Sequence, residues 1–259
     1  GAADKTGTIL YAMGQTQHTV GSQNVRCMAM IQLLLGNLGR PGGGVNALRG
    51  ESNVQGSTDQ GVLAHLVPGY LGVPQATSNP TLAAYIAKET PKTGYWANKP
   101  KFLVSMLKAW WGDHATEANQ FAYEYLPKVE SPAHHYWISL FEDVYAGKIQ
   151  GLWIMGQNPA VSGPNSRLER EALKKLKWMV VQEIFDTETC SFWRAPGVKP
   201  ADIQTEVFIL PAGDAMEKQG SIVTSGRLIQ WRPKVAEKPG EALPDDQILN
   251  LIALKLKEL

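Results

Sequence analysis

The C-terminal half of the sequence repeats one pattern, a short apolar run of strand length that is followed by glycine or polar residues. Three such runs occupy residues 150–155, 178–184 and 206–210. Strands that alternate with short helices indicate a parallel sheet, and such sheets bind ligands in a crevice beyond the carboxyl ends of their strands. The sequence therefore predicts an α/β fold, in which helices flank a Rossmann-like parallel sheet.

Helices between and after these strands are indicated by capping residues. Ser166 and Glu169 have the spacing of a capping box at the start of a helix that runs to residue 177. Residues 187–193 are expected to form a helical turn. Asp245 is expected to be the N-cap of an amphipathic helix that continues to the C-terminal residue.

The N-terminal segment predicts a strand, a loop and a helix. Residues 7–13 are β-prone and end at Gly14, and residues 22–35 have apolar residues at helical spacing. Gly36 and Asn37 follow, and either residue can adopt the left-handed conformation that ends helices. The loop of this unit is where α/β proteins place their ligands.

Between these parts, residues 57–72 are expected to form a loop with short turns, and residues 80–149 a helical insert. Within the insert, Trp110 and Trp111 are expected to be core aromatics rather than a stacking platform for a ligand. The predicted organisation has three regions: 1–56 with the active-site loop, 57–149 with the insert, and 150–259 with the sheet.

A glycine-rich loop at residues 42–56 carries a single arginine, Arg49, among five glycines. Glycines let main-chain amides approach a ligand closely, and a guanidinium can grip two oxygens of a carboxylate or phosphate with its planar fork. The alternative is a surface loop in which Arg49 pairs with a neighbouring acid. Spacing alone leaves both interpretations open.

Length and charge exclude several classes of protein. With 259 residues and 44% hydrophobic content, the chain can form one large or two small domains. Its 25 basic and 24 acidic residues include no polybasic tract, so nucleic acid is not expected as a partner. The longest apolar run, residues 28–35, is interrupted by Gln32 and is too short to cross a membrane.

Cysteine and histidine are sparse and widely spaced. Cys27 and Cys190 have no second cysteine at ligand spacing, so the chain is expected to hold no iron–sulfur cluster, and Cys27 is expected to be a buried thiol. No metal ligands are predicted. The remaining histidines are expected to be structural or exposed: His65, His114, His134 and His135.

Three turns after the predicted strands carry polar residues that could converge on one ligand. They are Gly156-Gln157-Asn158, Gln182-Glu183 and Gly213-Asp214. The carboxylate of Glu183 could accept hydrogen bonds from ribose hydroxyls or from a guanine edge. As ordinary turn formers and helix caps, the same residues would need no ligand.

Several motifs, taken in order along nearly the whole chain, together carry a family resemblance. They are Tyr11-Ala12-Met13-Gly14-Gln15-Thr16-Gln17-His18, the Arg49 loop, Gly156-Gln157-Asn158-Pro159, Val181-Gln182-Glu183-Ile184, Asp186-Thr187-Glu188-Thr189, Leu210-Pro211-Ala212-Gly213 and Glu217-Lys218-Gln219-Gly220-Ser221-Ile222-Val223-Thr224-Ser225-Gly226-Arg227. The sequence closely resembles the catalytic subunit of molybdenum- or tungsten-dependent formate dehydrogenases. The Arg49 loop and the segment from Glu217 to Arg227 are its specific parts.

The resemblance implies a mainly parallel fold of the molybdopterin oxidoreductase (DMSO reductase-like) type and two molybdopterin guanine dinucleotides with molybdenum or tungsten. It implies that Arg49 holds formate beside the metal, and that His18 forms hydrogen bonds near the cofactor rather than transferring a proton. The residues implied to contact the cofactor are Gly14, Gln15, Thr16, His18, Gln55, Gly156, Gln157, Asn158, Gln182, Glu183 and Thr187.

The metal's cysteine or selenocysteine ligand and the cysteines of a 4Fe–4S cluster match no residue of the chain, so a fragment that is inactive by itself is expected. The resemblance further implies an iron–sulfur electron-transfer subunit as partner and a periplasmic location, with the cytoplasm as the alternative. Two alternative functions stay open at this point, a pterin enzyme that acts on nitrate or a related oxyanion and a scaffold subunit that has lost the cofactor.

Overall fold

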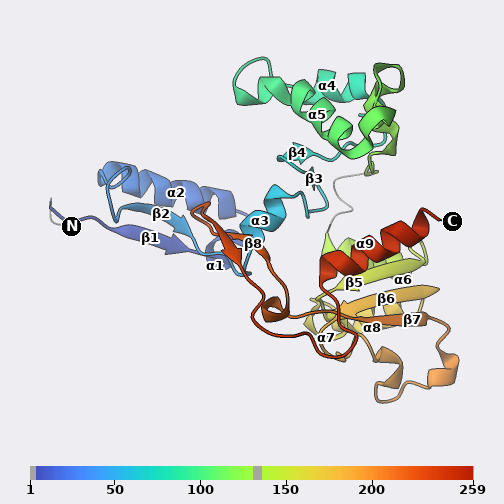
Figure 1. Ribbon diagram of the computed structural model, residues 1–259. Coiled ribbons are helices and arrows are strands. Elements are labelled where there is room, and N and C mark those ends of the chain that lie inside the picture. Colours follow the sequence, from blue (N-terminus) through green and yellow to red (C-terminus); the bar gives the residue numbers. More distant parts are fainter. Residues whose placement is uncertain (1–3, 131–135, 259) are drawn as a thin grey trace. The chain divides into compact units, whose positions relative to one another are not determined.

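A computed structural model describes residues 4–130 and 136–258 of the chain. These residues belong to two units, which are coloured along the chain in Figure 1. The first unit contains the N-terminal segment up to Tyr70 together with Ser221–Arg232. The second contains Leu71–Gly220 and the C-terminal segment from Pro233. The functional regions 1–56, 57–149 and 150–259 stay a prediction, because units defined by packing do not test them.

A parallel strand pair and one long helix form the centre of the first unit. Strand β1 (Thr8–Tyr11) pairs in parallel with β2 (Gly44–Ala47), and helices α1 (Met13–Thr16) and α2 (Gly21–Leu34) connect them. The predicted strand and helix are thus confirmed, and the segment predicted as a loop between them contains the short helix α1. Gly36 has a φ of 64° and ends α2 as expected.

A buried amide ties α2 to both strands of this pair. Gln32 is 2% exposed, and its Nε2 donates to the carbonyl oxygens of Gly7 at 3.1 Å and Gly44 at 2.9 Å. Its Oε1 accepts from Asn37 Nδ2 at 2.6 Å. On the same helix the expectation of a buried Cys27 is wrong, because the side chain lies on the exposed face of α2.

The rest of the first unit follows the Arg49 loop. Helix α3 (Val54–Asp59) begins within the last residues of this loop. Residues 57–59 are therefore helical, and the loop expected at residues 57–72 is shorter than predicted. Strand β3 (Leu66–Val67) comes next. Strands β8 (Gly220–Val223) and β9 (Ile229–Arg232), far along the sequence, pair with each other.

A three-stranded parallel sheet organises the C-terminal part of the second unit, as predicted. Its order is β5 (Gly151–Met155), β6 (Trp178–Glu183) and β7 (Glu206–Pro211). The accompanying helices are α6 (Trp137–Tyr145), α7 (Pro159–Ser162), α8 (Ser166–Leu173) and α9 (Asp245–Leu256). Short 3-10 helices lie at η5 (Phe192–Arg194), η6 (Pro200–Asp202) and η7 (Ala215–Glu217).

The core of this part lies between the sheet and helices α6 and α8. Phe141, Leu173, Met179 and Val181 are each at most 2% exposed. Burying a side chain of this size contributes about 1.5–3 kcal/mol. The sheet is therefore fixed by apolar contacts on its covered face, which leaves the carboxyl ends of its strands free to form a site.

Two predicted helix caps are wrong, for the same reason. Asn165, not Ser166, caps α8, because its side-chain oxygen accepts from the Leu168 amide at 3.3 Å. Glu169 turns inward, where its Oε1 accepts from Trp137 Nε1 at 2.7 Å. Asp245 is the first residue of α9 and makes no capping bond. In each case the carboxylate that a local cap would have used accepts a hydrogen bond from a residue far away in the sequence instead.

The insert is helical, as predicted, but the aromatic residues in its core are not the ones expected. Its elements are β4 (Leu71–Gly72), α4 (Leu82–Glu89), η1 (Tyr95–Asn98), α5 (Lys99–Trp111), η2 (Gly112–His114) and η3 (Glu117–Tyr125). Trp110 and Trp111 are 46% and 37% exposed, so they are not core residues. Tyr85 and Tyr123 are buried instead, edge to face at 6.2 Å, and burial raises the pKa of Tyr85 to about 12. None of the described helices is long and apolar enough to span a membrane.

Candidate functional site

The first unit contains a cleft of about 280 Å³ beside the Arg49 loop. One wall is the loop itself and the start of α3, and the other is the end of β8 with the turn that follows it. The lining residues are Leu48, Arg49, Glu51, Ser52, Asn53, Val54, Ile222, Val223, Thr224 and Ser225. The two segments that are specific to the family resemblance thus meet at one cleft.

Arg49 is exposed at this cleft and is not paired with an acid among the described residues. Within residues 4–130 and 136–258, its side chain has one hydrogen-bond partner, Gln55, whose Oε1 accepts from Arg49 Nη2 at 3.3 Å. A neutral amide orients a guanidinium without cancelling its charge. The positive charge therefore stays available to an anion, and the neighbouring acid considered from the sequence is not found among these residues.

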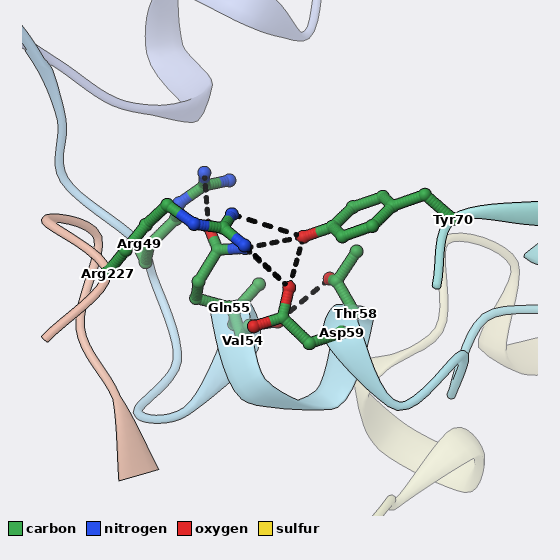
Figure 2. A network of polar contacts seen from close by, with 7 residues as sticks. All are labelled: Arg49, Val54, Gln55, Thr58, Asp59, Tyr70 and Arg227. Carbon is green, nitrogen blue, oxygen red and sulfur yellow. Dashed lines mark hydrogen bonds and ion pairs between the residues drawn. The ribbon is translucent and has the colours of Figure 1, made fainter. Parts of the chain in front are cut away.

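Behind Arg49 lies a polar network that Figure 2 shows from close by. Gln55 is 7% exposed, and its Nε2 donates to Tyr70 Oη at 2.6 Å and to Asp59 Oδ1 at 3.1 Å. The Tyr70 hydroxyl donates to the same carboxylate oxygen in a short hydrogen bond. Arg227 Nη2 lies 3.4 Å from this oxygen.

These contacts keep Asp59 ionised. The hydrogen bond from Tyr70 is the largest influence that holds the pKa of Asp59 below its usual value, followed by the bond from Gln55 and the charge of Arg227. The hydrogen bond to Tyr70 and the charge of Asp59 in turn raise the pKa of Arg227. The network is therefore an ion pair bridged by a phenol and an amide, and its amide oxygen points at Arg49.

The start of α3 is held against β8 by Asn53. This residue has a φ of 63°, and its Oδ1 accepts from the Val223 amide at 3.0 Å. A Cβ at Gly56 would lie 2.1 Å from that same Oδ1, so only glycine leaves room for the contact. The local chain thereby brings the Arg49 loop and the 221–232 segment together.

The second unit contains a cleft of similar size, about 280 Å³, at the carboxyl ends of the parallel strands. Its position is the one that the sequence predicts for an α/β sheet. Gly156 follows β5 with a φ of 59° and has open space on its side-chain side. The lining residues are Gly156, Gln182, Glu183, Ile184, Ala212, Gly213, Asp214, Ala215, Lys218 and Asp245.

Gln182 is the most informative residue of this cleft. It is 1% exposed, and its Nε2 donates to Asp245 Oδ1 at 2.7 Å, while the other carboxylate oxygen forms a short ion pair with Lys218. Its Oε1 is buried and has no hydrogen-bond partner among the described residues. A buried acceptor without a partner costs about 1–3 kcal/mol, so a ligand that donates a hydrogen bond here would recover that cost.

Three predicted cofactor residues after the strands are outside this lining. Asn158 Oδ1 accepts from Thr189 Oγ1 at 2.7 Å, and its Nδ2 donates to Glu188, which lowers the pKa of that carboxyl. Thr187 Oγ1 lies 3.5 Å from Cys190 Sγ. Gln157 is exposed. The structure thus brings Gly156, Gln182 and Glu183 together at one cleft, whereas Asn158 is bonded to Glu188 and Thr189 instead.

The predicted cofactor residues near the N-terminus lie in and after α1. Gly14, Gln15, Thr16 and His18 are exposed, and His18 Nε2 is hydrogen bonded to the carbonyl oxygen of Gly14 at 2.8 Å. Side chains on this short helix can therefore reach a ligand that lies against the unit. Their assignment to a cofactor stays a prediction.

Metal-ligand candidates were sought among the same residues. In the parts of the chain that the structure describes, no three His, Cys, Asp or Glu side chains gather as a metal site. His65 and His114 are exposed, and His134 and His135 lie outside the described residues. Cys190 is a buried free thiol.

Sequence reasoning gave no role to Asp59, Tyr70 or Lys218, and it read Asp245 as a helix cap. Arg227, like Lys218, belongs to the segment from Glu217 to Arg227 that carries the family resemblance, but no role was predicted for it. Each of these residues acts through a contact with a partner that is 11 or more positions away. Among these residues, only Lys218 and Arg227 could have been found from the sequence. They are polar residues in the segment from Glu217 to Arg227, which is specific to the family resemblance, and such residues indicate a site.

Comparisons with known proteins show the family of the chain. The family model described as molybdopterin oxidoreductase matches residues 1–255. The chain is 52% identical over 265 residues to a formate dehydrogenase subunit alpha of Megalodesulfovibrio gigas, which covers 100% of the chain and 26% of that protein. It is 47% identical to the formate dehydrogenase-O major subunit of Escherichia coli, over 100% of the chain and 26% of that protein.

A more distant relative is the F420-dependent formate dehydrogenase 1 subunit alpha of Methanococcus maripaludis, at 32% identity over 96% of the chain and 29% of that protein. The chain spans about a quarter of the length of the curated relatives it matches.

Proposed function

Because the chain belongs to the molybdopterin oxidoreductase family, which implies a molybdopterin cofactor, we propose that it is part of the catalytic subunit of a formate dehydrogenase. The reaction is the oxidation of formate to carbon dioxide. The observation that carries the proposal is Arg49, an exposed guanidinium at a cleft, whose only hydrogen-bond partner among the described residues is a neutral amide. The names of the relatives support formate as the substrate.

Arg49 binds and orients the substrate in this proposal. Formate is a small planar anion, and the guanidinium fork can hold both of its oxygens while its C–H points away from the arginine. Fixing this orientation converts an encounter into a geometry close to that of the reaction. The product carbon dioxide carries no charge, so its attraction to Arg49 is weaker and its release is favoured.

The cofactor proposed here is a pair of molybdopterin guanine dinucleotides that carries molybdenum or tungsten. When bound, this centre supplies the two-electron oxidant. In the second unit, Gly156 allows close approach of a phosphate, Glu183 can accept from hydroxyl or amino groups, and the buried Gln182 oxygen fits a hydrogen-bond donor of the ligand.

The rest of the electron path lies outside the residues of this chain in the proposal. A segment of the full-length subunit holds a 4Fe–4S cluster, and an iron–sulfur subunit accepts the electrons. The proposal includes a periplasmic location and a role in anaerobic respiration, and cell fractionation of the host organism checks the location.

The test of the proposed function is Arg49→Lys in the full-length holoenzyme. Lysine keeps the charge but loses the planar fork. The enzyme should therefore lose about 2–4 kcal/mol of transition-state stabilisation, which lowers kcat/KM for formate. Formate-dependent reduction of a viologen dye gives kcat and KM. Arg40→Lys, an exposed arginine shortly before the same loop, is the matched control and should leave both constants unchanged.

Metal and pterin analysis of the same preparation tests the cofactor. An Arg49→Lys enzyme that oxidises formate within about threefold of the parent rate would show that the guanidinium of Arg49 does not hold the substrate. A full-length protein that binds neither pterin nor metal would instead indicate a scaffold subunit.

A further inference from the structure

The direction of the Gln55 amide is determined by its partners. A carboxylate can only accept hydrogen bonds, so the amide nitrogen must face Asp59, and the amide oxygen must then face the other way. That oxygen accepts from Arg49 Nη2 at 3.3 Å. Asp59 thereby decides which end of Gln55 meets Arg49, although it makes no contact with Arg49 itself.

The Tyr70 hydroxyl completes the constraint. It donates to Asp59 and accepts from Gln55 Nε2 at 2.6 Å and from Arg227 Nη1 at 3.5 Å. A phenol has one donor and two acceptor positions, and here all three are used. Both hydrogens of the Gln55 amide are used as well, one on Asp59 and one on Tyr70 (Figure 2).

The backbone at this network is held in a conformation that bulky residues seldom adopt. Tyr70 has a φ of 62° and Arg227 a φ of 63°. Such values cost free energy for residues with a large side chain, and they persist where surrounding contacts require them. Here they bring two side chains from distant segments onto one carboxylate.

We infer that Asp59 and Tyr70 are positioning residues that act through Gln55 to fix the guanidinium of Arg49 at the cleft. This inference rests on the proposed function, in which Arg49 binds a small planar anion. Neither residue touches that anion. The network keeps the forked face of Arg49 turned to the cleft, and without it the long side chain samples several rotamers, so that ordering it on binding costs additional entropy.

The test uses Asp59→Asn and Tyr70→Phe in the full-length holoenzyme. Asp59→Asn allows the new amide to turn either end toward Gln55, so the direction of Gln55 is no longer determined. Tyr70→Phe removes only the hydroxyl. We expect KM for formate to rise about tenfold in Asp59→Asn and by about three- to fivefold in Tyr70→Phe, while kcat changes less than about twofold.

Nitrate, a planar monoanion, serves as a second probe, and its inhibition constant should rise in the same proportion as KM. Asp113→Asn and Tyr125→Phe are matched controls, since both residues are exposed and neither side chain makes a hydrogen bond within the described residues. Pterin and metal content should equal the parent's in every variant. A higher KM with unchanged kcat and cofactor content indicates a positioning role. A structural role would instead lower kcat and cofactor content together.

A double-mutant cycle tests the path through Gln55. If Asp59 acts through this amide, adding Asp59→Asn to Gln55→Met produces no further rise in KM, whereas independent effects would multiply. Multiplied effects, or KM values within twofold of the parent in both single variants, overturn the inference. If Asp59→Asn does not retain pterin, Tyr70→Phe alone decides. A parent enzyme that does not oxidise formate contradicts the proposed function instead, so the two failures are distinguishable.

Discussion

Gln55 in the first unit and Gln182 in the second are both buried amides whose nitrogen donates to an aspartate that is paired with a cation. Asp59 is paired with Arg227, and Asp245 is paired with Lys218. The two sites differ at the amide oxygen. Gln55 Oε1 accepts from Arg49, whereas Gln182 Oε1 is buried without a partner among the described residues.

This difference indicates two uses of one arrangement. In both sites the acceptor-only carboxylate fixes the direction of the amide. In the first unit the fixed oxygen orients Arg49, the side chain that binds the anion in the proposed function. In the second unit the fixed oxygen is buried without a partner among the described residues, and in the proposed function it accepts from a donor of the cofactor. The first site should therefore control substrate affinity and the second cofactor retention.

The largest expected effects come from Gln→Glu at each position. Gln182→Glu puts a second carboxylate against Asp245 where the side chain is 1% exposed, and like charges in a buried place repel strongly. We expect pterin content to fall to about a tenth of the parent's, since one unpaired buried charge commonly costs several kcal/mol. Pterin fluorescence after oxidative release measures it.

Gln55→Glu also faces an aspartate, Asp59, but it should act differently, because the new carboxylate lies against Arg49 and pairs with it. An arginine in an ion pair is less available to formate, so KM should rise about tenfold while pterin content stays within about twofold of the parent's. Loss of pterin in both variants to the same degree would show that the two amides do not have separate roles.

Smaller effects are expected from Gln→Met, which removes the amide at nearly constant volume. Gln55→Met loses several satisfied hydrogen bonds and should destabilise α3 by about 1–3 kcal/mol. Gln182→Met also removes an acceptor that has no partner, so the cofactor-free protein should change by less than about 1 kcal/mol around β6. Native-state hydrogen exchange of the backbone amides in α3 and β6 measures both changes in stability. Equal losses of stability in the two variants would show that the two amides do not differ in this respect.

The smallest effects are expected when only the cation is exchanged. The Arg227 side chain is 62% exposed, and the Lys218 and Asp245 side chains are 28% and 39% exposed. Ion pairs that are open to solvent contribute little and are weakened by salt. Arg227→Lys should change KM for formate by less than about twofold, and Lys218→Arg should change pterin content equally little. Measurements of KM and of pterin content at low and high salt check this. A large change in either variant would show that the cation, and not the amide, determines substrate affinity or cofactor retention.

The fold of the second unit could be predicted because its signals are local. Apolar runs such as Gly151–Met155 and Trp178–Glu183 have the length and composition of buried strands, and the glycine and polar residues after them mark the edge where ligands bind. Placement of Gly156 and Glu183 at one cleft followed from this rule alone. The end of α2 at Gly36 was equally local.

Arg49 was singled out from the sequence because one fixed cation among glycines is a local pattern. Its surroundings were not predictable in this way. Arg227 meets Tyr70 across 157 positions and Asp59 across 168, and no periodicity links residues so far apart. The wrong caps at Ser166 and Asp245 have the same origin, since carboxylates suited to local bonds formed tertiary ones instead.

The sequence by itself thus determined the strands, the helix ends and the arginine that can bind an anion, because each depends on neighbours within a few positions. The tertiary structure alone decided which groups hold that arginine and which amide oxygen has no hydrogen-bond partner among the described residues. Those choices depend on loop closure and on strained φ values at Tyr70 and Arg227, which only the contacts of the folded chain can maintain.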